Sequence, residues 1–356
     1  MGSKGSPLAG VQGAEPPGLP LRRRRLWPRV LAVVLLLPVL AVGGAVGLVW
    51  HLCRQPGPLA ESRAIVVPRG ASDQIAGALV RAGVVADGRV FLIASWVSGK
   101  DGPLRAGEYA FPAQANVWEV LHVLRTARPV QHRLTIPEGL TARQAQVLLG
   151  KTETLAGEMP ALDEAAWLPE TYSFERGTLR TTVMDKAKAA MAKALADAWA
   201  GREQGLPLAN AREALILASI VERETGKPDE RPRVAAVFLN RLRQGIRLQS
   251  DTTVVYAASD GMGVLDRPIS RADLDRDSPF NTYRMRGLPP TPIAAPGMAA
   301  IQAVLHPAKT DDLYFVADGM GGHVFARTLD EHNRNVARWR ALGTQPAAAP
   351  TPPPAR

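Results

Sequence analysis

Two glutamates that follow an uncharged run could supply acid–base chemistry. Residues 214–221 carry no charge and one polar side chain, Ser219, and Glu222 and Glu224 come directly after them. A helix with no polar face is expected to be buried nearly all round. A carboxylate that continues such a helix is costly to ionise unless it is paired. The raised pKa that results suits a general acid working near neutral pH.

The helical neighbours of the two glutamates differ in size. The side chains three and four positions before Glu222 are small, and those before Glu224 are bulky. We therefore expect Glu222 to face a cleft and Glu224 to pair internally, with an arginine such as Arg241 or Arg243. The alternative is that both carboxylates lie at a fraying helix end and only bind nearby arginines, because perturbed carboxylates are often structural.

Other catalytic and metal-binding patterns do not fit the sequence. His306, His323 and His332 match no common zinc spacing, and H-E-x-x-H is absent. A structural role for these histidines is the expected one. No P-loop, dinucleotide fingerprint or G-x-S-x-G elbow occurs. The single cysteine, Cys53, excludes an intramolecular disulfide.

Several long segments together resemble one known family. They are residues 167–174 (WLPETYSF), 217–225 (LASIVERET), 237–251 (VFLNRLRQGIRLQSD), 280–283 (FNTY), 287–297 (GLPPTPIAAPG) and 306–333 (HPAKTDDLYFVADGMGGHVFARTLDEHN). In this order they resemble the YceG-like catalytic domain of the MltG-type endolytic murein transglycosylases, and the resemblance runs from about Ile65 to Trp339. The resemblance implies a membrane-anchored enzyme with a LysM-like subdomain, whose catalytic glutamate falls on Glu222.

The resemblance also implies a reaction. The enzyme would cleave nascent peptidoglycan strands between N-acetylmuramic acid and N-acetylglucosamine, leave a 1,6-anhydro-muramyl end and terminate strand elongation. Glu222 would protonate the glycosidic oxygen and then, as a carboxylate, take the proton of the muramyl 6-hydroxyl. That hydroxyl attacks C1 of its own sugar, a step favoured by proximity. One carboxylate suffices, and no metal or cofactor is required.

By the same resemblance, polar side chains line the cleft and hold the sugars. Glu224 would have a supporting role, and the expected substrate-binding residues are Ser219, Gln249, Ser250, Asp251, Asn281, Thr282 and Tyr283. For two of them a structural role stays open: Asp251 could cap a helix that starts at Thr252, and Asn281 could make a turn.

Two other functions remain open. A non-catalytic, membrane-anchored scaffold would bind peptidoglycan through its LysM-like part. A two-carboxylate glycoside hydrolase would use Asp251 as its second acidic group.

The distribution of charge favours a membrane anchor over nucleic-acid binding. The net charge is +10, but residues 1–29 hold six basic residues against one acidic residue. The remaining +5 is spread over 327 residues, too thinly for a phosphate-binding face. Residues 30–50 are 21 uncharged positions, and as a helix they would extend roughly 31 Å, about the thickness of the bilayer core.

The arginines at 22–25 predict the orientation of this helix. Basic residues beside a membrane helix stay cytoplasmic. We therefore expect a single-pass protein of the bacterial inner membrane, with a cytoplasmic N-terminus and a periplasmic or otherwise extracytoplasmic catalytic domain. Peptidoglycan strands and the bilayer are the expected partners, and peptidoglycan synthases are candidate partners.

The rest of the chain indicates an α+β protein with two exported parts. Residues 1–29 form the basic tail, 30–50 the membrane helix and 51–63 a linker. Strand–turn–helix patterns in residues 64–150 suggest a small LysM-like region, although such units are about as often purely structural. Residues 151–343 should form the larger mixed α+β catalytic domain. The Pro/Ala-rich residues 344–356 are expected to be disordered.

Overall fold

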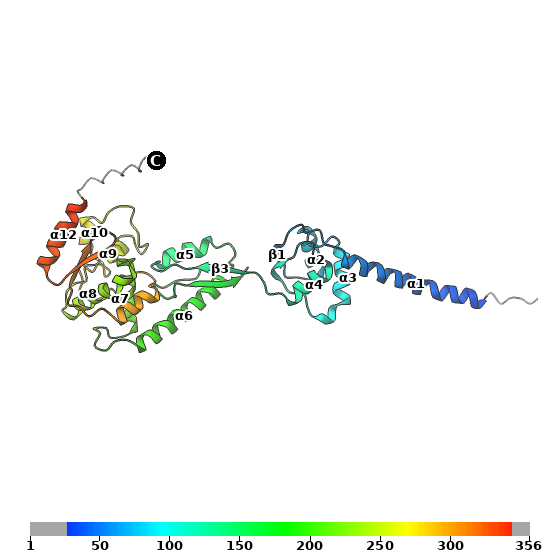
Figure 1. The fold of residues 1–356 in the computed structure, drawn as a ribbon, viewed down its shortest axis with the longest axis horizontal. Coiled ribbons are helices and arrows are strands. Elements are labelled where there is room, and N and C mark those ends of the chain that lie inside the picture. The colour runs from blue at the N-terminus through cyan, green and yellow to red at the C-terminus, as the bar shows by residue number, and fades with distance from the viewer. Residues whose placement is uncertain (1–26, 344–356) are drawn as a thin grey trace, which may run out of the picture. The chain divides into compact units, whose positions relative to one another are not determined.

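The computed structural model describes residues 27–343 of this mixed α+β chain (Figure 1). The chain divides into two units. The described part of unit 1 comprises residues 27–63, 68–105 and 111–127, and that of unit 2 comprises residues 64–67, 106–110 and 128–343. The tails at 1–26 and 344–356, with the arginine cluster and the predicted disorder, lie outside the described residues.

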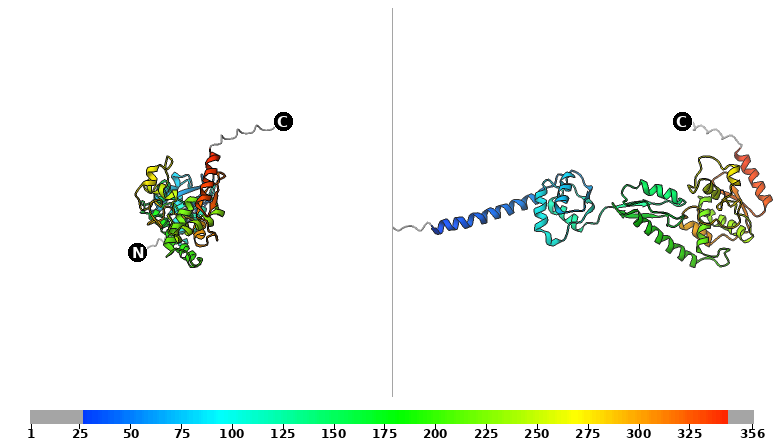
Figure 2. Two further views of the ribbon diagram at one scale, coloured as in Figure 1. Left: turned by 90° about the vertical axis from the view of Figure 1, so that its left-hand side faces the viewer. Right: turned by 180° about the vertical axis from the view of Figure 1, so that it is seen from behind.

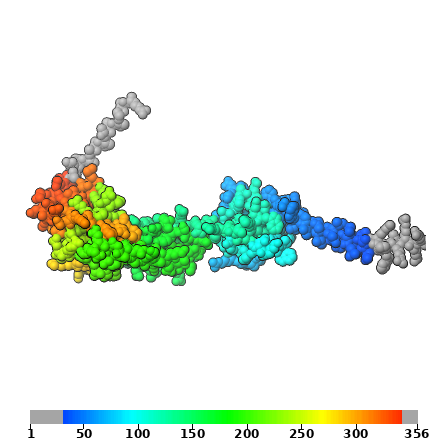
Figure 3. Space-filling model, turned by 60° about the horizontal axis from the view of Figure 1, so that its bottom comes forward, coloured from blue at the N-terminus to red at the C-terminus, as the bar shows by residue number. Residues whose placement is uncertain are grey.

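Helix α1 (Trp27–Arg54) is the apolar helix that the sequence predicts, extended beyond the expected 30–50. Leu31–Arg54 is long and apolar enough to cross a membrane. Figure 3 shows most of this blue helix standing clear of the other elements of unit 1. Only its last turn is packed, since Cys53 is fully buried. The linker predicted at 51–63 is therefore helical at its start.

Three more helices complete unit 1: α2 (Ser72–Arg81), α3 (Gly88–Val97) and α4 (Val117–Thr126), with a short 3-10 turn at Gly99–Asp101. The residue before α2 is Ala71, and its side chain makes no capping bond. Helix α3 was not expected from the sequence. Its cap is the side chain of Asp87, which accepts a 2.7 Å hydrogen bond from the Arg89 amide.

The strands form three separate two-stranded sheets. Strand β1 (Arg63–Val67) pairs with β2 (Gly107–Phe111), and β3 (Gln131–Thr135) runs antiparallel to β4 (Thr171–Glu175). Helices α5 (Ala142–Lys151) and α6 (Arg180–Ala200) are drawn on either side of the β3–β4 ribbon in Figure 1 and in the right view of Figure 2, and buried side chains of both helices and of the ribbon form one apolar cluster.

The β3–β4 pairing bears on one expected boundary. Because β3 pairs with a strand beyond residue 150, the third strand–turn–helix pattern belongs to the larger unit. Helix α5 begins at the predicted cap, where Thr141 accepts a 3.3 Å hydrogen bond from the Gln144 amide. The compact unit that contains α5 thus resumes at residue 128, and the functional domain boundary at residue 150 stays a prediction.

Helix α7 (Ala211–Glu224) lies at the centre of unit 2. It packs against α6, α8 (Arg231–Arg243), α9 (Asp251–Ala258) and α11 (Met298–Leu305). Every residue from 214 to 221 is buried, which confirms the prediction made from its uncharged sequence. Its two end turns leave this apolar core, and the last one carries Glu222 and Glu224.

The C-terminal elements close unit 2. A short 3-10 turn (Pro228–Glu230) precedes α8, and α10 (Arg271–Asp275) follows α9. The predicted hairpin is present as β5 (Tyr314–Ala317) and β6 (His323–Ala326). The last helix, α12 (Leu329–Gly343), packs against both of these strands.

Candidate active site

A groove of about 590 Å³ lies at the end of α7 and contains Glu224 but not Glu222. It is built from the start of α9 and from side chains of α8, β5 and α12. The polar and aromatic residues along it are Glu224, Phe238, Arg241, Gln249, Ser250, Asp251, Tyr283, Tyr314, Phe315, His323, His332, Asn333 and Trp339. The end of the buried helix therefore delivers one carboxyl group to a polar, open groove.

Only one of the two carboxyl oxygens of Glu224 accepts hydrogen bonds from the described residues. The hydroxyls of Ser250 and Thr252 both donate to its Oε1, the latter over 3.3 Å. Its Oε2 accepts no hydrogen bond from the described residues. Burial raises the pKa of Glu224, and the negative charge of Asp251 raises it further, against the opposing effect of the two hydroxyl donors. One oxygen is thus oriented, and the other is available to a substrate.

Glu222 is engaged at both oxygens. Its Oε1 accepts a 3.0 Å hydrogen bond from the Arg231 guanidinium, and its Oε2 accepts one of 3.0 Å from the Gly297 amide. The side chain is only 6% exposed. Burial raises its pKa, which the Gly297 amide and the Arg231 charge counteract. Glu222 therefore ties α7 to the starts of α8 and α11.

The expected division between the two glutamates is reversed. Glu224 faces the groove, and the carboxyl group with an arginine partner is that of Glu222. The prediction compared neighbours on α7 alone, whereas helices packed against α7 decide which side chain is covered. The arginines expected beside Glu224 bond elsewhere: Arg241 donates to the Leu313 carbonyl over 2.6 Å, and Arg243 donates to Asn240 over 2.9 Å.

Four of the expected substrate-binding residues lie together in the groove: Gln249, Ser250, Asp251 and Tyr283. The Tyr283 hydroxyl donates a 2.6 Å hydrogen bond to Asp251. Asp251 is the first residue of α9, and its exposed side chain faces the groove instead of capping the helix. Gln249 has a left-handed backbone (φ 50°), a conformation that costs energy and is frequent at functional sites.

Three expected substrate-binding residues are fully buried and do not line the groove. The Ser219 hydroxyl donates to the Ile216 carbonyl and accepts from the Ile293 amide, over 2.7 and 3.0 Å. The Thr282 hydroxyl accepts a 3.0 Å hydrogen bond from the Ser250 amide, so it supports the loop that carries Ser250. Neither hydroxyl lines the groove, and the direct sugar contact expected of each stays a prediction.

The third residue, Asn281, makes a turn, which was the structural alternative to sugar binding. Its amide donates to the carbonyls of Leu274 and Arg276 over 2.9 and 2.8 Å. Its side-chain oxygen accepts from the Tyr283 amide over 3.1 Å. Asn281 thus fixes the loop that presents Tyr283 without touching the groove.

Residues of the C-terminal hairpin and helix were missed as groove residues. The His332 ring stacks on Tyr314 with centroids 5.1 Å apart, and burial lowers the pKa of this histidine. His323 pairs with Glu230 over 2.7 Å. Trp339 adds an aromatic side chain, 43% exposed. The segment 306–333 was recognised as part of the resemblance, but its periodicity gives no sign that it borders Glu224.

No group of three or more His, Cys, Asp or Glu side chains within residues 27–343 could hold a metal ion. The groove itself offers a carboxyl group with a raised pKa, a second carboxylate beside it, and hydroxyl and aromatic groups along the walls.

Comparison with known proteins assigns the chain to a family. Residues 65–338 match the YceG-like family, and the chain belongs to it. An endolytic murein transglycosylase of Streptococcus pneumoniae is 31% identical over 362 residues, which cover 86% of this chain and 64% of that protein. The chain thus spans slightly less than two thirds of the length of this relative.

Two further similarities concern parts of the chain or its fold. An endolytic murein transglycosylase of Bacillus subtilis is 48% identical over 120 residues, or 34% of this chain and 32% of that protein. A crystal structure of a YceG-like protein from Listeria monocytogenes has 26% sequence identity and a TM-score of 0.47, and it covers 77% of this chain and 99% of that one.

Proposed function

We propose that this protein is a membrane-anchored lytic transglycosylase that cuts peptidoglycan glycan strands internally. Its relatives are named endolytic murein transglycosylases, and the chain matches the YceG-like family over most of its length. The cut falls between N-acetylmuramic acid and N-acetylglucosamine and leaves a 1,6-anhydro-muramyl end, so that it terminates strand elongation. The observation that carries the proposal is the half-engaged carboxyl group of Glu224 in the groove.

Glu224, in place of Glu222, is proposed as the acid and base. Burial favours its protonated form, which can donate a proton to the glycosidic oxygen from the unengaged Oε2. The resulting carboxylate then takes the proton of the muramyl 6-hydroxyl as that oxygen closes on C1. The nucleophile belongs to the substrate, so proximity replaces the second catalytic carboxylate of a hydrolase.

The other groove residues orient Glu224 and the sugars. Ser250 holds Oε1, so that Oε2 points away from the loop. Tyr283 and Asp251 form a bonded pair on the wall, which can bind sugar hydroxyls. Trp339 offers an apolar face of the kind on which sugar rings pack.

Mass spectrometry of glycan strands incubated with the protein tests the reaction. Transglycosylation adds no water to the cut strand, so fragments should carry anhydro ends. The second candidate function is hydrolysis by two carboxylates, which the presence of Asp251 beside Glu224 favours. Fragments heavier by one water per cut would establish that alternative. Binding without any cut, by wild type and by Glu224→Gln alike, would establish a scaffold.

The location follows from the anchor. Helix α1 is long and apolar enough to span a bilayer, and the basic residues before it favour a cytoplasmic N-terminus. We propose a single-pass protein of the bacterial inner membrane with its groove in the extracytoplasmic space. Peptidoglycan synthases that extend the strands are the proposed partners there.

For unit 1 we propose the glycan-binding role expected of a LysM-like region. A hollow of about 710 Å³ in this unit is lined by Ser72, Ser95, Trp96 and Arg125 among others. Trp96 is 84% exposed and offers a flat face for a sugar ring. Trp96→Ala should lower co-sedimentation with insoluble peptidoglycan at unchanged thermal stability. Equal sedimentation would assign unit 1 a structural role.

A further inference from the structure

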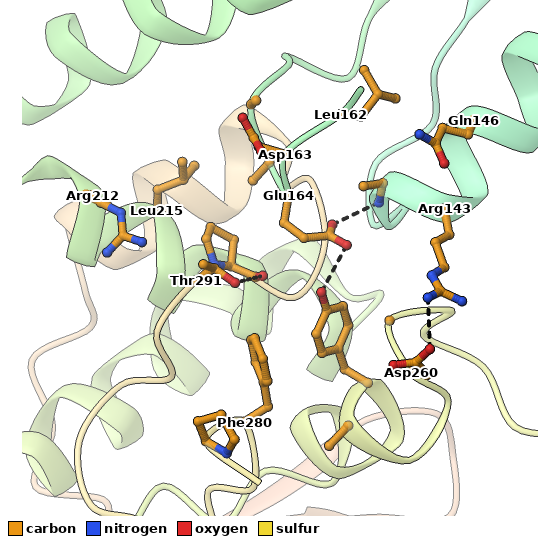
Figure 4. Close-up of a pocket in the computed structure, with 18 of the residues that line it drawn as sticks. Arg143, Gln146, Leu162, Asp163, Glu164, Arg212, Leu215, Asp260, Phe280 and Thr291 are labelled. Atoms are coloured by element: carbon orange, nitrogen blue, oxygen red, sulfur yellow. Dashed lines mark hydrogen bonds and ion pairs between the residues drawn. The ribbon is translucent and has the colours of Figure 1, made fainter. Parts of the chain in front are cut away.

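A second, larger cavity in unit 2 shares no lining residue with the Glu224 groove. Its volume is about 1030 Å³, and it is bordered by α5, the start of α7, the end of α9 and the loop at 160–166 (Figure 4). The proposed chemistry does not use it, although Phe280, Thr291 and Pro292 of the segments that carry the resemblance line it. Its size would accommodate a ligand of several residues.

The rim of this cavity carries exposed charges of both signs. Arg143 pairs with Asp260 over 2.8 Å, and their side chains are 56% and 89% exposed. Arg212 lies on the opposite side of Glu164 from Arg143 in Figure 4, and it donates a 2.6 Å hydrogen bond to the Pro290 carbonyl. An exposed ion pair contributes about 0–1 kcal/mol, so a charged ligand can replace either partner at little cost.

The inner lining of the cavity is tied together by hydrogen bonds and ring packing. The Glu164 carboxyl group accepts hydrogen bonds from the Ala142 amide and the Tyr256 hydroxyl, over 2.9 and 3.1 Å. The Tyr256 ring packs on Phe280 with centroids 4.9 Å apart and planes at 54°. Burial raises the pKa of Glu164, which favours a neutral group between the two arginines.

Backbone strain is concentrated at the two sites. Four non-glycine residues within 27–343 have a left-handed backbone; Ala165 and Asp260 line this cavity, and Gln249 lines the Glu224 groove. For alanine the conformation costs roughly 1–2 kcal/mol, because its Cβ crowds the following carbonyl. Such strain persists where the surrounding structure enforces it, commonly at binding sites.

We propose that this cavity binds the peptide branch of the strand whose sugars occupy the groove. Such a branch is a short peptide with free carboxylates and a free amino group. The carboxylates pair with Arg143 and Arg212, and the amino group pairs with Asp260. A bare glycan fits less well, because Tyr256 and Phe280 pack on each other instead of presenting one flat face. The inference rests on peptidoglycan being the substrate.

The spacing of the two sites suits one branched ligand. Helix α9 carries Asp251 of the groove at its start and Tyr256 of the cavity near its end. Eight helical residues extend roughly 12 Å. An extended peptide of four residues spans about 13–14 Å. The rise of α9 between the two sites is therefore within the length of such a peptide.

Calorimetric binding to two strand preparations tests the proposal. The protein is the full chain with Glu224→Gln, so that no strand is cut. The probes are uncross-linked glycan strands with their peptides and the same strands stripped of peptides by an amidase. Adding Arg143→Gln should weaken binding of the peptide-bearing strands by up to roughly fivefold, the upper value of one exposed ion pair, and leave binding of stripped strands unchanged.

A matched variant controls for loss of a surface ion pair. Arg271 pairs with Asp275 over 2.9 Å on exposed α10, away from the cavity. Arg271→Gln should bind both preparations as the parent does. Equal weakening of both strands by Arg143→Gln, or no weakening of either, would overturn the proposal. Because binding is measured without turnover, a failure of the transglycosylase assignment would appear separately, in the product masses.

The amino group is tested by acetylating it on the strands. Acetylation should weaken binding to the parent, and Asp260→Asn should bind both forms equally weakly. Asparagine tolerates the left-handed backbone at position 260, so the variant removes a charge without new strain. If acetylated strands bind the parent as well as untreated ones, the amino group is not recognised and the peptide assignment is wrong.

Discussion

The hydroxyl of Ser250 donates a hydrogen bond to Oε1 of Glu224, which joins the end of α7 to the start of α9. Two residues earlier on the same helix, Glu222 is bound at both oxygens by Arg231 and Gly297. One helix end thus presents two carboxyl groups with raised pKa values and different surroundings. When two nearby carboxyl groups have different surroundings, one can act as a proton donor while the other has a structural role.

Replacing Glu224 should abolish turnover without unfolding the protein. Glu224→Gln keeps the shape and the hydrogen bond from Ser250 but removes the transferable proton. General acid–base catalysis contributes about 10²–10⁴-fold, so release of fragments from glycan strands should fall by at least that order. Thermal unfolding should stay within a few degrees of wild type, because an amide replaces a carboxyl group that burial already disfavours as an anion.

Replacing Glu222 should act on stability instead. Glu222→Gln removes the 3.0 Å anionic partner of the Arg231 guanidinium, which is 11% exposed, and leaves it only the more exposed Glu138 carboxyl group at 3.8 Å. An unpaired buried polar or charged group costs about 1–3 kcal/mol. The midpoint of thermal unfolding should fall by roughly 3–10 °C, while the folded fraction keeps near-normal turnover. A folded but inactive Glu222→Gln beside an active Glu224→Gln would restore Glu222 as the catalytic residue.

The pH dependence of turnover should move in opposite directions in two variants. Activity requires protonated Glu224, so it is lost as pH rises through the pKa of this group. The Asp251 charge raises that pKa, and the Ser250 hydroxyl lowers it. Asp251→Asn should therefore shift the alkaline limb of kcat/KM to lower pH, and Ser250→Ala should shift it to higher pH.

The pH at which kcat/KM falls on the alkaline side distinguishes a changed pKa of Glu224 from a loss of substrate contacts. A substitution that only weakens sugar binding lowers kcat/KM at every pH and leaves the limb in place. If both variants titrate as wild type does, the limb belongs to another group. His323, whose charge also acts on Glu224, is then the next group to substitute.

The predicted substrate-binding residues should divide into two kinds. Asn281→Ala removes a buried amide that donates to two loop carbonyls, which should lower the free energy of unfolding by about 1–3 kcal/mol. Gln249→Ala changes an exposed groove side chain and should raise KM with little loss of stability beyond the left-handed backbone cost. Denaturant unfolding and initial rates on one strand preparation measure both. A raised KM at unchanged stability for Asn281→Ala would return this residue to the groove.

The elements of unit 2 were largely readable from the sequence because their signals are local. The buried run at 214–221, the cap at Thr141 and the hairpin around 318–322 each depend on residues close in sequence. Helix α3 was missed although Asp87 caps it. Residues 88–97 are mostly apolar, and the capping aspartate was not recognised as the start of a helix.

The site was less predictable because it is assembled by tertiary packing. Which glutamate is covered depends on Arg231 and Gly297, and no spacing along α7 reveals either partner. Asn281 and Tyr283 are two residues apart in one motif, yet one is buried and the other lines the groove. A motif shows that residues act together and leaves open which of them touch the ligand.

The orientation of α1 can be measured by labelling introduced cysteines, because the native Cys53 should not react. Cys53 is fully buried, so a membrane-impermeant maleimide should leave the wild-type protein unlabelled in intact spheroplasts. Ala192→Cys, exposed on α6, should be labelled there. Ser6→Cys, in the basic tail, should be labelled only after the membrane is permeabilised. The reverse pattern would place Glu224 on the cytoplasmic side, away from peptidoglycan, and the proposed function would fail with it.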